Sequence, residues 1–292
     1  MDRETAINKN NVIDEQWDMI IRPQRGWWEL HLSDLWLYRD LIRLFVWRDF
    51  VANYKQTILG PLWYLIRPIL STVVFTIIFG KIAGLPTDNL PPFLFYLAGN
   101  TVWSYFSTSL VATSNTFTSN AGIFGKVYFP RLTVPVSVVI SNLISFGIRF
   151  GVFLAFWAYY LLAGTAFTPT WWVFSLPLLL LLMAGMGLGL GIIVSSLTTK
   201  YRDLRNLVDF GVQLAMYATP VIYPLSTVSG VWRWVILLNP MTSIIELFRL
   251  AFLGVSSIDP IWLLYTCGFT LVFLLIGVVL FNHVEASFMD TV

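Results

Sequence analysis

The chain has 292 residues, of which 57% are hydrophobic and only 12% are charged, and its mean hydropathy is +0.72. A soluble domain carries about 25% charged residues, so this composition excludes a water-soluble globular protein and indicates an integral membrane protein. The net charge is only +2, and the single cysteine, Cys267, excludes a disulfide within the chain. Because no apolar segment with a small-residue cleavage site precedes residue 60, we expect the first spanning helix to serve as the insertion signal.

Residues 1–61 are expected to form a cytoplasmic segment, within which residues 33–56 are predicted to be a helix lying along the membrane surface. Leu37, Leu41 and Phe45 recur at helical spacing, as in an amphipathic helix. The basic residues of this segment admit two interpretations. They contact anionic lipid headgroups, or they guide a phosphate-bearing substrate to a cytoplasmic entrance. The residues concerned are Arg39, Arg43, Arg48 and Lys55.

Six apolar stretches follow that are long enough to cross a bilayer, whose core of about 30 Å needs roughly 20 apolar residues per helix. We therefore predict an all-α polytopic membrane protein with six transmembrane helices in residues 62–281 and a cytoplasmic tail over 282–292. The spans are expected at about 62–80, 93–112, 134–162, 171–197, 207–225 and 261–281.

A seventh apolar stretch, residues 231–252, is expected not to span the membrane. It contains three charged residues and is interrupted by Asn239-Pro240, and such charges are costly in lipid. We predict a re-entrant or interfacial helical hairpin buried against protein. Asn239 and Pro240 are predicted to cap its second helix, and Glu246 and Arg249 are placed to form a local pair.

The distribution of Lys and Arg predicts the orientation of the chain. Thirteen of the 18 basic residues lie in segments that six spans place on one side: eight before residue 62, two in the loop 113–133 and three in the loop 198–206. Since basic residues concentrate on the cytoplasmic side, both termini are expected in the cytoplasm.

No residue pattern in the sequence supports catalysis or metal binding. The two histidines, His31 and His283, are far apart and lie outside the predicted spans, so neither a metal site nor a proton relay is indicated. The sequence also has no G-x-x-x-x-G-K-[ST] phosphate-binding loop. ATP-driven work would therefore require a separate ATP-binding subunit.

Small residues and one intramembrane charge bear on helix packing. Gly185/Gly189 and Gly187/Gly191 form two overlapping small-xxx-small pairs, which permit close helix approach within the chain or across a homodimer. Arg149 lies in the middle of a long apolar stretch. A charge there must face protein or water, so Arg149 is either a structural counter-ion or part of a polar route.

Five motifs follow one another along the chain. They are RDFVANYKQTILGPLW at 48–63, NAGIFGKVYFPR at 120–131, YRD at 201–203, PVIYP at 220–224 and NPMTSIIELFR at 239–249. Together they resemble motifs of type-2 ABC transporter permeases that export polysaccharides, such as O-antigen, teichoic acid and capsule exporters. The resemblance runs from about residue 20 to the end. One departure is Gly125, where the family often has a polar or charged residue.

The resemblance implies a homodimer in the bacterial inner membrane, docked on separate ABC ATPase subunits and moving a lipid-linked polysaccharide. It implies no cofactor on this chain, because ATP and Mg would bind the ATPase, and no nucleic-acid partner. The segment 114–130 would be a coupling helix, with ATPase contacts expected from Asn120, Ile123, Phe124, Lys126, Val127 and Arg131.

The resemblance also implies a translocation path that suits sugar rings and an external gate over 226–256. The candidates for lining the path are Tyr54, Trp63, Trp103, Tyr105 and Arg149. The candidates for the gate are Pro220, Tyr223, Pro240, Glu246 and Arg249.

Other functions fit the sequence less well. In a type-2 permease for drugs or lipids, neither the long basic N-terminal segment nor the KVYFPR loop would be expected. A polytopic membrane transferase would need an Asp/His cluster in a loop, and few acidic residues lie outside residues 1–61. A channel or scaffold that works without an ATPase is left open.

Overall fold

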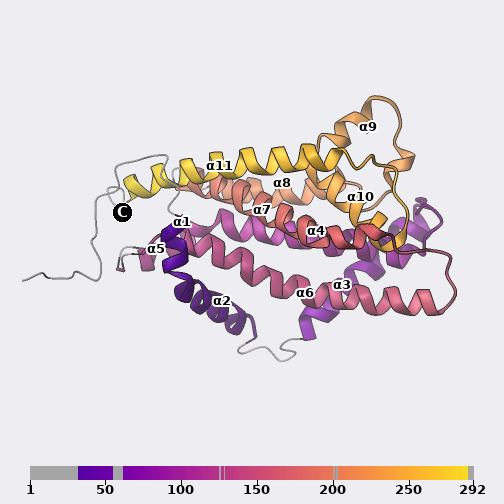
Figure 1. Cartoon of the computed structure of the whole chain (residues 1–292), viewed down its shortest axis with the longest axis horizontal. Coiled ribbons are helices and arrows are strands. Elements are labelled where there is room, and N and C mark those ends of the chain that lie inside the picture. Colours follow the sequence, from indigo (N-terminus) through magenta and orange to yellow (C-terminus); the bar gives the residue numbers. More distant parts are fainter. Residues whose placement is uncertain are drawn as a thin grey trace, which may run out of the picture.

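The computed structural model describes residues 32–54, 62–124, 126–127, 129–199, 201 and 203–288, and every regular element in these residues is a helix (Figure 1). The elements are α1 (Leu32–Leu37), α2 (Arg39–Tyr54), α3 (Trp63–Phe75), its π-helical continuation η2 (Thr76–Ile82), α4 (Pro92–Ser114), α5 (Thr116–Phe124), α6 (Thr133–Leu162), η3 (Trp171–Ser175), α7 (Leu176–Thr198), α8 (Leu204–Tyr217), η4 (Leu225–Thr227), α9 (Gly230–Leu237), α10 (Pro240–Leu253) and α11 (Trp262–Phe288).

The long helices run side by side along the longest axis of the molecule, with α1, α2 and α5 near one end and α9 and α10 at the other (Figure 1). Helix α4 lies at the centre of this bundle, since it packs against α3, α6, α7, α8 and α10. Most of its side chains are buried, including polar ones such as Asn100 and Thr101.

Four described helical segments are long and apolar enough to cross a membrane: 65–82, 133–162, 171–198 and 262–284. Counting the bent pair α9 and α10 as one span gives five. Helix α4 falls outside this set because it is rich in Ser, Thr and Asn, and α8 because it has only 14 residues. The chain is thus an integral membrane protein, while the predicted count of six spans does not follow from helix length and hydropathy.

Helix α8 is shorter than the sequence suggested. A helix was predicted over 207–225, but α8 ends at Tyr217 and a turn follows before η4. Pro220 and Pro224 lie just beyond the end of the helix, where proline cannot continue it and disfavours helical geometry in the residue before it.

The apolar stretch 231–252 is divided into two helices, α9 and α10, whose axes are bent by 92°. The break lies at Asn239-Pro240, as predicted from the sequence. Asn239 accepts a hydrogen bond from the Met241 backbone N–H at 3.0 Å, and Pro240 occupies the first turn of α10.

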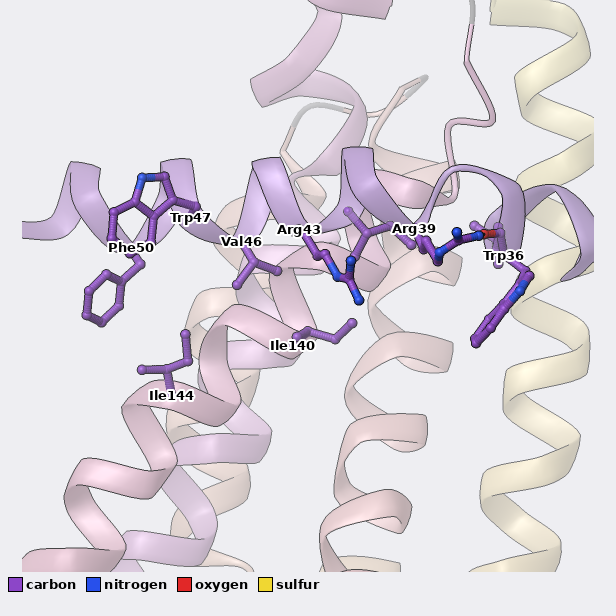
Figure 2. A pocket seen from close by; sticks show the side chains of 10 residues that line it. Trp36, Arg39, Arg43, Val46, Trp47, Phe50, Ile140 and Ile144 are labelled. Carbon is purple, nitrogen blue, oxygen red and sulfur yellow. The ribbon is translucent and has the colours of Figure 1, made fainter.

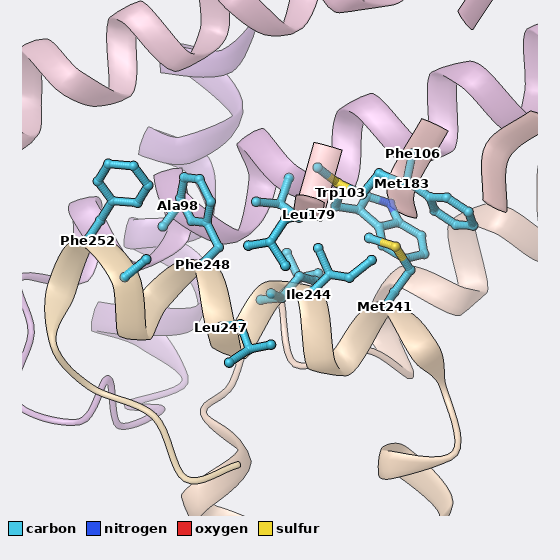
Figure 3. Packing of buried hydrophobic residues seen from close by; sticks show 14 of the residues in the cluster. Ala98, Trp103, Phe106, Leu179, Met183, Met241, Ile244, Leu247, Phe248 and Phe252 are labelled. Atoms are coloured by element: carbon cyan, nitrogen blue, oxygen red, sulfur yellow. The ribbon is translucent and has the colours of Figure 1, made fainter. Parts of the chain in front are cut away.

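The apolar side of α10 faces the bundle. Figure 3 shows Phe248 and Phe252 near Ala98 of α4, and Met241 and Ile244 on the same helix facing Met183 and Trp103. Almost every side chain of α10 is buried, so this helix belongs to the protein core despite its two charged residues.

The glycines of α7 bring three helices into close contact. A Cβ at Gly189 would lie 2.9 Å from the Leu274 backbone of α11, and a Cβ at Gly191 would lie 2.5 Å from the Thr113 Cβ of α4. Gly185 likewise faces Thr270 of α11, while Gly187 faces α4. Both small-xxx-small pairs therefore serve packing within the chain, which confirms the first of the two interpretations left open by the sequence.

Candidate functional site

A buried ion pair lies on α10. Arg249 Nη1 is 3.3 Å from Glu246 Oε1, and their side chains are only 2% and 3% exposed. The pairing follows from their spacing of three residues, which places both on the same face of a helix. The local pair considered at the level of sequence is thereby confirmed. Arg149, the other intramembrane arginine considered, is half-buried on α6.

The ion pair holds four segments together. Arg249 Nη2 donates to the Val221 carbonyl at 3.0 Å, in the turn after α8, and its guanidinium lies 3.7 Å from the centre of the Phe95 ring of α4. Glu246 Oε2 accepts from Ser256 Oγ at 3.2 Å and from the Ser257 N–H at 3.3 Å. The pair thus connects α4, the turn after α8, α10 and the loop that leads to α11.

The tight fit around this pair explains a glycine in α4. A Cβ at Gly99 would lie 3.1 Å from Arg249 Nη2 and 3.0 Å from the Val221 carbonyl oxygen. Pro220 is buried next to this contact, and Tyr223 is half-buried. The structure therefore brings the five gate candidates into one region. Pro220 and Tyr223 flank the carbonyl that Arg249 binds, and Asn239, next to Pro240, donates to the Oγ1 of Thr219, next to Pro220, at 2.8 Å.

The segment predicted to couple to an ATPase lies at the opposite end of the bundle and has an exposed and a buried side. Ile123, Lys126 and Val127 are exposed, and Asn120 is half-buried with its Nδ2 donating to the Thr116 carbonyl at 3.0 Å. Phe124 is buried. Its ring is therefore not available to another subunit in this conformation.

Arg131 is buried too, and its guanidinium lies 5.5 Å from the centre of the Phe124 ring. Of the six residues predicted for the ATPase contact, four are thus at least partly exposed and two, Phe124 and Arg131, are buried against the bundle. Sequence spacing alone does not distinguish these two groups.

A row of aromatic rings fixes this end of the bundle and was not recognised from the sequence. Phe45 of α2 contacts Phe129 at 5.8 Å between ring centres, and Phe129 contacts Phe124 at 5.8 Å. Phe124 contacts Phe117 at 5.9 Å, and Phe117 stacks on Phe281 of α11 at 4.6 Å. The row links α2, α5 and α11, which are far apart in the sequence.

The basic residues of α2 do not share one environment. Arg39 and Arg43 line a cavity of about 640 Å³ between α2 and α6, together with Trp36, Trp47 and apolar side chains (Figure 2). Arg48 lies outside this lining, forms an ion pair with Asp49 at 2.8 Å and places its guanidinium 4.7 Å from the Phe45 ring centre. Lys55 lies outside the described residues.

The candidates for a sugar path are also separated. Trp103 and Tyr105 are buried in the core, where the Tyr105 hydroxyl donates to the Val139 carbonyl at 3.4 Å. A path lined by these two rings would require the core to open. Trp63 is exposed on α3, and its ring lies 5.5 Å from the Arg67 guanidinium. The side chain of Tyr54 is not among those described.

The fold and these sites define a helical membrane protein without an ATP-binding domain in its described part. The sequence matches the ABC-2 type transporter family over residues 40–253. Because the match covers most of the chain, the protein belongs to this family and is a transporter membrane subunit rather than an enzyme.

Its relatives include the O-antigen export system permease protein RfbA of Klebsiella pneumoniae. That protein is 29% identical over 252 residues, which are 86% of this chain and 94% of the relative. A protein of the same name from Myxococcus xanthus is 29% identical over 225 residues, 76% of this chain and 83% of the relative.

Proposed function

We propose that this chain is the permease subunit of an ATP-driven exporter that moves a lipid-linked cell-surface polysaccharide across the bacterial inner membrane. One observation carries the proposal: the chain aligns over 94% of the length of a relative named an O-antigen export permease. The five motifs of the sequence point to the same class of exporter.

The proposed topology has six spans, with both termini in the cytoplasm. The four helical segments that qualify by length and hydropathy would be joined by α4 and α8. A helix enclosed by protein need not be apolar all round, and α4 is surrounded by five other helices. Helices α9 and α10 would form the external re-entrant hairpin, since most of α10 is buried in protein.

The proposed coupling to ATP hydrolysis uses the exposed side of α5 and the residues after it. Ile123, Lys126 and Val127 would contact a separate ATPase subunit, which would bind ATP and Mg. Phe124 and Arg131 would instead hold the segment against the bundle, because both are buried. Two copies of the chain would form the exporter, each with its own ATPase.

The proposed gate is the region around the Glu246–Arg249 pair. The buried pair contacts three segments besides its own helix and keeps all four in one arrangement. Separating them would deprive Arg249 of the Val221 carbonyl and Glu246 of the Ser256 and Ser257 donors, and polar groups left unsatisfied in a buried site are costly. Opening a path for a polymer at this end would require that arrangement to change.

The test is deletion of the gene in the source bacterium, followed by complementation with the wild-type chain and with Lys126→Glu. Deletion should remove the polysaccharide from the cell surface while lipid-linked polymer accumulates inside, and only the wild-type chain should fully restore export. Unchanged surface polysaccharide together with increased sensitivity to drugs would refute the proposal and favour the efflux alternative.

A further inference from the structure

A second cavity continues from the one beneath α2. It has a volume of about 740 Å³ and lies between α6, α7 and α11. Ile140 lines both cavities, so they adjoin along the first turns of α6. Figure 2 shows α2 crossing above this region, with Ile140 and Ile144 of α6 below it and the yellow ribbon of α11 alongside. We call the two cavities together the capped groove.

The two parts of the capped groove differ in chemistry. The part between α6, α7 and α11 is lined almost entirely by apolar side chains, such as Leu181, Leu271 and Leu274. These three helices are all long and apolar enough to cross a membrane, so hydrocarbon is the solvent that this part meets. The part beneath α2 adds two arginines and two tryptophans, the residues that favour headgroup depth.

The arginines can bind an anion in addition to their contacts within the chain. Arg39 Nη1 donates to the Trp36 carbonyl at 3.3 Å, and Arg43 Nη1 donates to Asp40 Oδ1 at 3.1 Å. Each bond uses one of the five N–H donors of a guanidinium, whose fork geometry suits phosphate oxygens. The two side chains are four residues apart on one helix and therefore on the same face.

We propose that the capped groove binds one anionic glycerophospholipid of the surrounding bilayer. Its phosphate would lie at Arg39 and Arg43, and its acyl chains would pass Ile140 and lie between α6, α7 and α11. This assigns the first of the two interpretations of the basic surface helix to Arg39 and Arg43. Arg48, which lines neither cavity, is not part of the site.

The geometry favours a resident phospholipid over the exported lipid-linked polymer. The cavity that holds Arg39 and Arg43 lies beneath α2 (Figure 2) and has a volume of about 640 Å³, which suits a phospholipid headgroup rather than a headgroup that carries a polymer. The exposed apolar faces of α3 and α8 are separate from the groove, since both helices pack on α4 and none of their residues lines it. The proposed phospholipid site is therefore separate from these faces, whichever substrate the protein exports.

Native mass spectrometry of the delipidated full-length chain tests the proposal. The protein is titrated with phosphatidylglycerol or with phosphatidylcholine of the same acyl chains. The wild type should retain one phosphatidylglycerol with about tenfold preference over phosphatidylcholine. Arg39→Gln and Arg43→Gln should each weaken that retention severalfold, and the double variant should abolish the preference. Ile140→Trp should weaken retention of both lipids, because it narrows the passage for the acyl chains.

Arg48→Gln is the matched control, since it removes one positive charge from the same helix and should leave retention unchanged. Equal retention of the two lipids by the wild type would overturn the proposal. So would a loss in Arg48→Gln as large as that in Arg43→Gln, because it would indicate attraction by net charge alone. Displacement of phosphatidylglycerol by an equal concentration of a polyprenyl phosphate would also overturn it, in favour of the carrier lipid.

Discussion

Removing Arg249 should destabilise the protein far more than removing an arginine from an exposed pair of the same spacing. Arg249→Met leaves the Glu246 carboxylate, 3% exposed, with the Ser256 and Ser257 donors but no counter-ion. It also removes the donor to the Val221 carbonyl. Breaking a buried pair from one side costs about 3–5 kcal/mol, so we expect a loss of this size.

The chain contains its own control for burial. Asp40 and Arg43 are also three residues apart and 3.1 Å from each other, but their side chains are 75% and 77% exposed. Such exposed pairs contribute only about 0.2–0.5 kcal/mol, so Arg43→Met should change stability little. The two variants therefore compare the same pairing geometry in two environments.

The assay is the apparent melting temperature of the delipidated protein in detergent, so that loss of a lipid bound at Arg43 does not contribute. With about 2 °C per kcal/mol for a chain of this size, Arg249→Met should lower it by roughly 6–10 °C and Arg43→Met by about 1 °C. The double variant Glu246→Leu/Arg249→Met should be more stable than Arg249→Met alone, because it leaves no unpaired charge. Equal shifts for Arg249→Met and Arg43→Met, or an additive double variant, would refute this reasoning.

Three further predictions concern other parts of the chain. Gly191→Ala should destabilise the protein by about 1–3 kcal/mol through overpacking against Thr113. Gly151→Ala should instead be neutral or stabilising by up to about 1 kcal/mol, because a Cβ added there would have no atom of another element within 4 Å. Melting temperatures check both. Phe124→Ala should cost about 3–5 kcal/mol as a core deletion, whereas Lys126→Glu should leave stability within about 0.5 kcal/mol and still weaken copurification of the ATPase. In a cysteine-free background, Val231→Cys, which replaces an exposed residue of α9, should react with an impermeant thiol reagent added outside intact cells; labelling only after the cells are opened would contradict the proposed topology.

The sequence predicts most of the helices because the signals that form them are local. Apolar stretches of sufficient length, Asn239-Pro240 at the start of α10 and the spacing of Glu246 and Arg249 all act within a few residues. The end of α8 has a local signal as well, because Pro220 and Pro224 interrupt the outer part of the predicted span 207–225. The prolines determine the outcome because they remove backbone donors that no apolar side chain replaces.

The parts that could not be predicted depend on partners distant in the sequence. Whether Phe124 faces its own bundle or another subunit depends on Phe129, Phe117 and, through Phe117, on Phe281. The two pairs of glycines in α7 likewise look alike in the sequence, yet Gly187 and Gly191 face α4 whereas Gly185 and Gly189 face α11. Periodicity identifies the faces of a helix, but only the fold determines what each face contacts.

Helix α4 connects the two ends of the molecule at which the candidate sites lie. One end of it is joined to α5 through Asn115, and the other holds Phe95 and Gly99 against Arg249. Along its length α4 is in close contact with α7 through Gly187 and Gly191, and interiors packed this closely transmit displacements rather than absorb them. A movement of α5 that shifts α4 along its axis must therefore alter the surroundings of Arg249. The two helices fit closely there, since a Cβ added at Gly99 of α4 would lie only 3.1 Å from the Arg249 guanidinium.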